Sequence, residues 1–342
     1  MIGYYVHHQG RGHLRRLEAV AAHLRTPVVG LSSLPKPAGW QGDWVQLARD
    51  DDPSPASSDD VSARGVLHWA PRHHQGLSAR MATLASWVAR ERPAAVVVDV
   101  SVEVALLVRL CGTPVVVVAL PGERTDRTHL AAYDLADALL APWPAEAHTR
   151  GWPASWTSKT WCVGGLSRFD GRACPPAPKW DGNRPRRVLL LWGGGGRDAD
   201  ASSVEAARRA TPGWDWTERS PHRPSPDLWA ELCGADVVVT HAGQNAVADV
   251  AAARAPAVVV AQGRPFREQE ATAAALTRLG IADGHRSWPS ADRWVDVLEG
   301  AHRRGGAGWS RWSTGTGARA AAGHLDALAA GRTALVAAGE PA

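Results

Sequence analysis

The chain lacks several features that define specialised classes of protein. Lysine occurs only at Lys36, Lys159 and Lys179, so arginine supplies nearly all of the positive charge in a chain whose net charge is +4. That charge is spread along the sequence without a basic helix or tail, which argues against nucleic acid as a partner. The remainder, with 45% hydrophobic and 21% charged residues, is typical of a globular protein.

Cysteines and long apolar runs are also scarce. The four cysteines, at positions 111, 162, 174 and 233, show neither metal-ligand spacing nor the density of a disulfide scaffold. We therefore expect reduced thiols and a cytoplasmic protein. Residues 1–8 do not have the order of a signal peptide, and no apolar run approaches the roughly 18 residues that span a bilayer. Any membrane contact is expected to be peripheral, at the inner face.

Apolar strands alternate with helical patterns along the chain. Continuous β-branched runs such as residues 94–98 are typical of parallel strands that are covered on both faces. The alternation implies right-handed crossovers and open parallel sheets. We predict an α/β protein built from two doubly wound, Rossmann-like domains that face each other across a cleft. The predicted strands are 2–6, 27–31, 43–47, 94–98, 114–120 and 138–141, then 188–192, 214–217, 235–240 and 256–261.

The alternation lapses in one proline-rich stretch, which marks a domain boundary. We predict an N-terminal domain over residues 1–163, a linker over 164–186 and a C-terminal domain over 187–316. The remaining segment, 317–342, is alanine-rich, and its helical part is expected to pack back on the N-terminal domain.

Glycines and polar residues follow the predicted strands of the second half, where open α/β sheets bind ligands. The glycine run 193–196 allows a close backbone approach, and His241 to Asn245 opens a helix whose free N–H groups suit a phosphate. A diphosphate there could accept hydrogen bonds from the backbone at Gln244 and Asn245 and from the His241 ring. Asp249, one turn deeper on the same face, suits a ribose diol. Each residue taken singly also fits a purely structural role.

Together these residues resemble a known family. The pattern His241-x-Gly243-x-Asn245-x-x-x-Asp249, followed by Glu268-Gln269, is similar to the sugar-donor signature of GT-B fold glycosyltransferases, both UDP-sugar transferases and the lipid-precursor N-acetylglucosaminyltransferases. Asp249 is one methylene shorter than the usual glutamate, and Ala246 replaces a frequent serine. The resemblance implies a sugar-donor site formed by Gly194, Gly195, His241, Gly243, Gln244, Asn245, Asp249, Glu268 and Gln269.

The first half resembles the acceptor side of the same family more weakly, at Gly10 to His13. His13 is the first candidate for the base that removes the acceptor proton, with a structural or phosphate-contacting role as the alternative. Asp99 is the second candidate base. Gly10, Arg11 and Gly12 are predicted on the acceptor side. Arg11, Arg15 and Arg16 beside this turn either meet an anionic acceptor or form the solvated face of a helix, and the second interpretation is favoured. Further cleft-lining candidates are Glu103, His7 and His8.

No metal is predicted. The run Asp50 to Asp52 is interpreted as a solvated loop, and His68, His73 and His74 lack a carboxylate partner at helical spacing. The leading hypothesis is an inverting, metal-independent glycosyltransferase with a UDP-sugar as co-substrate and no further cofactor. Its acceptor is lipid-linked, a polymer or a small molecule. The alternatives are a nucleotide-sugar hydrolase or epimerase and a non-catalytic nucleotide-sugar binding protein.

Overall fold

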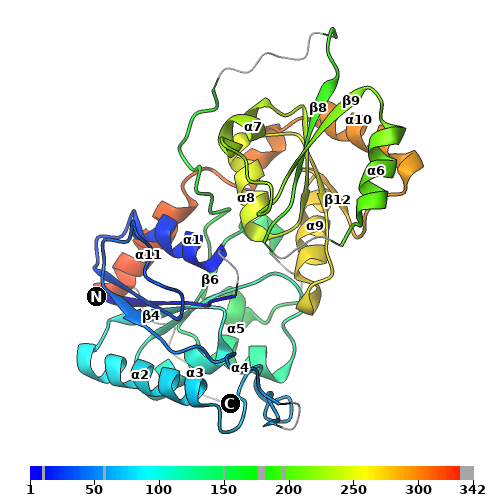
Figure 1. Cartoon of the computed structure of the whole chain (residues 1–342). Helices are drawn as coiled ribbons and strands as arrows, with labels where there is room; N and C mark the ends of the chain where they lie inside the picture. The colour runs from blue at the N-terminus through cyan, green and yellow to red at the C-terminus, as the bar shows by residue number, and fades with distance from the viewer. Residues whose placement is uncertain (10–11, 57–58, 149–150, 176–181, 195–197, 332–342) are drawn as a thin grey trace.

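Two parallel β-sheets, each carrying helices on both faces, make up the molecule (Figure 1). The computed structural model describes residues 1–9, 12–56, 59–148, 151–175, 182–194 and 198–331. The first sheet has seven strands and the second has five, and every pairing in both sheets is parallel. The predicted α/β class with two doubly wound units is therefore confirmed.

The first sheet has the strand order β3-β2-β1-β4-β5-β6-β7. Successive residues of a strand point to opposite faces. Tyr4 and Val97 therefore pack towards α1 and α11, and Tyr5 and Val96 towards α2, α3 and α4. The elements are β1 (Ile2–Val6), α1 (Gly12–Ala21), β2 (Val28–Ser32), β3 (Trp44–Gln46), α2 (Gln75–Glu91), β4 (Ala95–Asp99), α3 (Val102–Leu110), β5 (Val115–Val118), α4 (Arg127–Leu135), β6 (Ala138–Ala141), α5 (Ala154–Thr157), β7 (Thr160–Cys162) and the late helix α11 (Gly317–Ala329).

The second sheet has the strand order β12-β11-β10-β8-β9. Leu190 and Val239 face the cluster with α6 and α10, and Leu189 and Val238 face the cluster with α7, α8 and α9. The elements are β8 (Arg186–Leu191), α6 (Ala201–Ala210), β9 (Trp214–Arg219), α7 (Leu228–Gly234), β10 (Val237–His241), α8 (Gln244–Ala253), β11 (Ala257–Val260), α9 (Glu268–Arg278), β12 (Asp283–His285) and α10 (Trp294–Arg304).

The chain passes between the two sheets at two neighbouring places. The outgoing segment after β7 and the returning segment before α11 are hydrogen-bonded to each other, because the Gly165 N–H donates to the Trp312 carbonyl (2.9 Å) and the Ser313 hydroxyl donates to the Gly165 carbonyl (3.2 Å). A β-carbon at Gly317 would lie 2.7 Å from the same carbonyl oxygen. The returning helix α11 packs against α1 (Figure 1).

One expectation about the cysteines was wrong. Cys174, in the segment that leads to β8, forms a disulfide with Cys233 of α7, 59 residues away in the sequence. The widely spaced positions gave no sign of this pair, because the fold and not the spacing brings the two residues together. Cys111 and Cys162 are free thiols.

No helix within the described residues has both the length and the apolar character needed to cross a membrane.

Candidate active site

The predicted site residues follow strands at the switch points of the two sheets. In the first sheet, β1 and β4 are neighbours whose connections run in opposite directions, so His13 after β1 and Asp99 at the end of β4 lie at the crevice where open α/β sheets bind ligands. In the second sheet, β8 and β10 form the equivalent switch point. Gly193 follows β8, and His241 ends β10.

His13 and Asp99 form a hydrogen-bonded pair. The His13 Nδ1 lies 2.8 Å from the Asp99 Oδ1, with the His13 side chain 20% exposed and the Asp99 side chain 0% exposed. A carboxylate only accepts, so Nδ1 carries the proton and Nε2 keeps a free lone pair. This arrangement leaves the exposed imidazole nitrogen able to take a proton.

Asp99 differs from its prediction as a second candidate base, because no acceptor can reach it. Its carboxylate also accepts two hydrogen bonds from the Arg16 Nη1, at 2.6 and 2.7 Å. Burial raises the pKa of Asp99, but the charges of Arg16 and His13 outweigh it and hold this pKa below its ordinary value. Arg16 itself is 4% exposed, so the solvated helix face expected for it was wrong.

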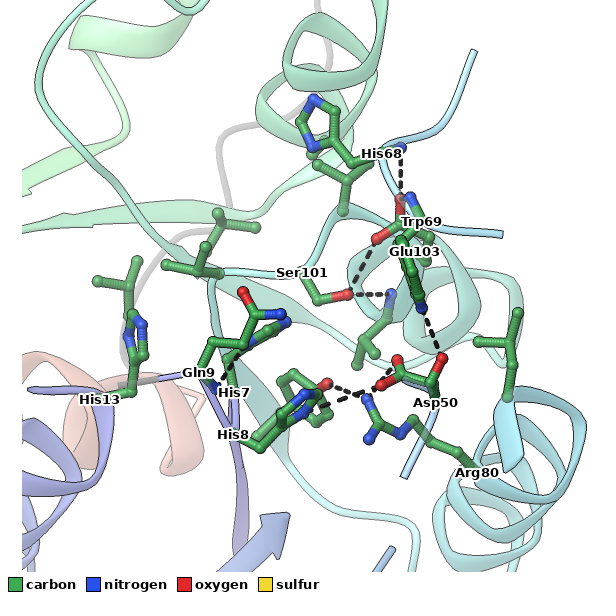
Figure 2. A pocket seen from close by; sticks show the side chains of 18 of the residues that line it. His7, His8, Gln9, His13, Asp50, His68, Trp69, Arg80, Ser101 and Glu103 are labelled. Atoms are coloured by element: carbon green, nitrogen blue, oxygen red, sulfur yellow. Dashed lines mark hydrogen bonds and ion pairs between the residues drawn. The ribbon is translucent and has the colours of Figure 1, made fainter. Parts of the chain in front are cut away.

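His13 lines a cavity of about 310 Å³ in the N-terminal domain (Figure 2). The predicted cleft residues His7, His8 and Glu103 line it too. Glu103 accepts hydrogen bonds from the backbone N–H groups of His68 and Trp69, at 2.7 and 3.0 Å, and thereby holds the opposite wall in place. Burial, with the neighbouring histidines, lowers the pKa of His7 to about 3, so this ring is neutral near pH 7.

The floor of this cavity holds a residue that was expected in solvent. Asp50 is 6% exposed and accepts a 2.6 Å hydrogen bond from the Arg80 Nη1 of α2. The solvated-loop interpretation was therefore wrong for Asp50. Its partner lies 30 residues away in the sequence, so local spacing gave no sign of the contact.

Val100, directly after Asp99, has φ +68°. This is a region of backbone conformation that β-branched residues rarely adopt and that costs about 1–3 kcal/mol. This left-handed turn lies between the end of β4 and the start of α3, beside the site.

A second cavity, of about 620 Å³, lies between the domains. It is lined by Gly12 and Arg15 of the N-terminal domain and by most of the predicted sugar-donor residues. Because Gly12 lines this cavity and His13 lines the other, the start of α1 is the boundary between the two. The sugar-donor candidates along this cavity are Gly194, His241, Gly243, Gln244, Asn245 and Asp249. Gly10, Arg11 and Gly195 lie outside the described residues.

His241 presents a buried hydrogen-bond donor. Burial, with the charge of Arg264, lowers the pKa of His241 to about 4, so the ring is neutral at pH 7. Its Nδ1 accepts from the Gly243 N–H at 3.1 Å, which leaves the proton on Nε2. This Nε2 is buried and has no partner among the described residues, and a β-carbon at Gly193 would lie 2.4 Å from it. The glycine at 193 is therefore required by the ring beside it.

The N-termini of α1 and α8 meet at the second cavity. A β-carbon at Gly12 would lie 2.3 Å from the Asn245 Nδ2, so the two helix starts approach as closely as a glycine allows (Figure 1). The α8 N-terminus has no side-chain cap, and its free N–H groups and positive dipole end favour an anion.

Asp249 is already engaged by the segment between the domains. Its carboxylate accepts from the Ser167 hydroxyl at 2.8 Å and from the Arg168 Nε at 3.1 Å, and it is 5% exposed. Burial raises the pKa of Asp249, although Arg168 opposes this shift. A ribose that binds this carboxylate must therefore replace one of these two partners.

Glu268 and Gln269 do not line the second cavity. The Gln269 Oε1 accepts from the backbone N–H groups of Ala242 and Gln262, both at 3.1 Å, and so joins the segments that follow β10 and β11. Glu268 accepts a 3.3 Å hydrogen bond from Arg124 of the N-terminal domain. Gln269 is 5% exposed, and the role of Glu268 and Gln269 as sugar contacts stays a prediction.

Phe266 is a contact that sequence reasoning missed. It lies in the turn Pro265–Arg267 and, like Arg267, has a left-handed backbone (φ +59° and +54°). Its ring lies 4.6 Å from that of His129 and 5.4 Å from that of His68, and Arg124 stacks on it at 4.8 Å. Through these ring contacts, Phe266 of the C-terminal domain packs against two histidines that line the first cavity.

Two groups of described residues offer three possible metal ligands within 4.8 Å of one another. One is His68, Asp126 and His129, and the other is His8, Asp50 and Asp51. The carboxylate partner that His68 lacks nearby in the sequence is thus Asp126, whose Oδ1 is 3.1 Å from the His68 Nε2. Hydrogen bonds already engage these carboxylates: Asp126 is bonded to His129, Asp51 to His8, and Asp50 to Arg80 outside its group.

Comparison with known proteins defines the fold. No protein-family profile and no curated protein sequence matches the chain. Among solved structures, the chain is similar to the glycotransferase of kitacinnamycin (TM-score 0.65, 15% identity, 96% of this chain and 98% of that chain). It is also similar to MurG of Acinetobacter baumannii (0.59, 16%, 96% and 99%) and to the spinosyn rhamnosyltransferase SpnG complexed with thymidine diphosphate (0.58, 16%, 97% and 96%). The chain has the GT-B fold of glycosyltransferases, as the resemblance implied.

Proposed function

We propose that the protein is an inverting, metal-independent glycosyltransferase that uses a nucleoside diphosphate sugar, with UDP-sugars as the first candidates. The observation that carries this proposal is the boundary at the start of α1. A base with a free Nε2 lies in one cavity, and an uncapped helix N-terminus with a buried N–H donor lies in the next. Such a pair of cavities suits an acceptor on one side and a diphosphate on the other.

The groups account for the reaction without a further cofactor. The His13 Nε2 takes the proton of the acceptor hydroxyl as its oxygen attacks the anomeric carbon from the face opposite the leaving group. The bond between that carbon and the phosphate oxygen breaks, and its electron pair leaves with the diphosphate. The His241 Nε2–H and the α8 N-terminus stabilise this developing charge. Asp99 stabilises the imidazolium and does not itself take the proton.

The nucleoside is the less defined part of the donor. A hollow of about 630 Å³ between α6 and β9 shares Gly193 and Gly194 with the diphosphate side, which offers room for a nucleoside. SpnG was solved with thymidine diphosphate, so thymidine nucleotides belong beside uridine nucleotides in any test.

A thermal-shift screen of nucleotides and nucleotide-sugars tests the sugar-donor site. A ligand that binds only the folded state must raise the midpoint temperature of thermal unfolding. Release of the nucleoside diphosphate from the bound donor is then measured with and without a cell extract. Release that depends on the extract supports transfer, and equal release in buffer supports the hydrolase instead.

The base is tested by a histidine pair on the same stretch of chain. His13→Ala is expected to lower turnover about 10²- to 10⁴-fold, as for loss of a general base, while nucleotide affinity stays within about twofold. His23→Ala, at an exposed position beyond α1, is the control and should behave as wild type. Unchanged turnover of His13→Ala would remove His13 as the base.

A further inference from the structure

A single guanidinium joins the two halves of the site. Arg16, in the second turn of α1, donates from Nη1 to both oxygens of Asp99, at 2.6 and 2.7 Å. From Nη2 it donates to the Oε1 of Gln244, the first residue of α8, at 2.7 Å. Arg16 therefore contacts the carboxylate that orients His13 and, in the other domain, a residue that opens the helix behind the diphosphate cavity.

This contact is specific to arginine. Arg16 and Asp99 are almost fully buried, at 4% and 0% exposure, and a buried charge needs a partner that also satisfies its hydrogen bonds. The planar fork of a guanidinium serves two acceptors in fixed directions, whereas an ammonium is a point charge. The orientation of the Asp99 carboxylate, and through it of the His13 ring, is therefore set by where Arg16 lies.

Gln244 has an unused hydrogen-bond donor. Arginine only donates, so the amide oxygen of Gln244 must face Arg16, and the amide nitrogen faces away from it. Gln244 lines the cavity between the domains and also a small one of about 20 Å³ beside α9, and its Nε2 is buried without a partner among the described residues. A second unpartnered buried donor, the His241 Nε2, borders the same cavity. Both donors lack an acceptor, and a phosphate oxygen in the cavity between the domains is an acceptor that suits them.

We propose that Gln244 and Arg16 are positioning residues that transmit occupancy of the diphosphate site to the catalytic base. A phosphate oxygen accepts from the Gln244 Nε2 and fixes the amide, whose Oε1 fixes Arg16, which in turn holds Asp99 in line with the His13 Nδ1. This inference rests on the proposed function. Its consequence is that an occupied diphosphate site restrains the His13 ring more tightly than an empty site does.

Nuclear magnetic resonance of the His13 ring tests this chain of contacts without an acceptor. The full-length protein is labelled with ¹⁵N-histidine, the His13 signals are assigned from the spectrum of His13→Gln, and UDP and thymidine diphosphate are titrated with calorimetry in parallel. In wild type, saturation with the nucleotide that binds should shift the His13 ring nitrogens. In Gln244→Ala, the nucleotide should bind with at most about a tenfold loss and leave these signals unmoved.

Gln262 offers a matched control. Its Oε1 also accepts from an arginine, Arg264, at 2.9 Å, but within the described part of the chain no hydrogen bond joins Arg264 to Asp99. Gln262→Ala should therefore keep the nucleotide-induced shift of His13. A further variant, Arg16→Lys, keeps the positive charge but loses the planar guanidinium that serves two acceptors. Its turnover should fall at least tenfold, while the KM for the sugar donor changes by less than about twofold.

The outcomes separate the two ideas. If neither nucleotide nor any nucleotide-sugar binds wild type, the proposed function fails and this proposal fails with it. If a nucleotide binds but His13 does not respond, or if His13 responds equally in Gln244→Ala, only the coupling through Gln244 and Arg16 is refuted. A loss of folding in Arg16→Lys, seen by circular dichroism, leaves Gln244→Ala to decide.

Discussion

Replacing Gly193 with alanine should close the proposed diphosphate site from within. The added methyl would lie 2.4 Å from the His241 Nε2 and 2.9 Å from its Cε1, closer than real β-carbon contacts. The ring must move, because the methyl is fixed to the backbone. Moving it breaks the 3.1 Å hydrogen bond from the Gly243 N–H and turns the buried Nε2–H away from the cavity.

The size of the effect follows from these contacts. Loss of one neutral hydrogen bond costs about 1 kcal/mol, and overpacking adds about 1–3 kcal/mol, so the free energy of unfolding should fall by a few kcal/mol. A hydrogen bond to a charged phosphate contributes about 1.5–3 kcal/mol, which corresponds to a roughly 10- to 150-fold weaker Kd for the nucleoside diphosphate.

Titration calorimetry of wild type, Gly193→Ala and Gly213→Ala provides the measurement. Gly213 is the matched control, because a β-carbon there meets nothing within 4 Å and the residue does not line either cavity of the proposed donor site. Near-wild-type affinity in Gly193→Ala, or an equal loss in both variants, would show that the His241 ring does not hold the diphosphate.

Two further results are expected of the folded protein. Burial lowers the pKa of His241 and of His129 to about 4, below the unfolded value near 6.5. The unfolded chain therefore binds more protons than the folded protein between about pH 6.5 and 4. The free energy of unfolding should fall by a few kcal/mol as the pH falls through this window. Burial raises the pKa of Asp170 to about 6, which opposes part of this loss. Denaturant unfolding at several pH values measures the slope, and a flat profile would contradict it. Cys174→Ser removes the link to Cys233 across 59 residues, which should lower the free energy of unfolding by up to about 4 kcal/mol; equal denaturation midpoints with and without reductant would contradict this.

Local patterns predicted the framework of the fold. Buried strands such as β4 and β6 were visible because a parallel strand covered on both faces must be apolar at every position. The site was visible for the same reason. A polar residue at the end of an apolar strand, such as His241, or at the start of the helix that follows one, such as His13, lies at the carboxyl edge of the sheet, where ligands bind.

Local sequence patterns could not predict contacts between distant segments of the chain. Arg16 has the spacing of a surface helix residue, and only its pairing with Asp99, 83 residues away, explains its burial. Asp249 was correctly placed one turn below Asn245, but the arrival of Ser167 from 82 residues away is a property of the fold. Phe266 gave no signal, because an isolated aromatic residue in a loop has no periodicity.

The double passage of the chain between the domains has a consequence for movement. A single linker would let the domains swivel freely, but here Gly165 is hydrogen-bonded to Trp312 and Ser313 of the returning segment. Twisting one domain about the linker would break these bonds, whereas bending about a line through both segments keeps them. We therefore expect the cleft to open and close by a single hinge rotation about the two connecting segments. Gly12 and Asn245 would move apart in this rotation, while the hydrogen bonds between the two segments stay intact.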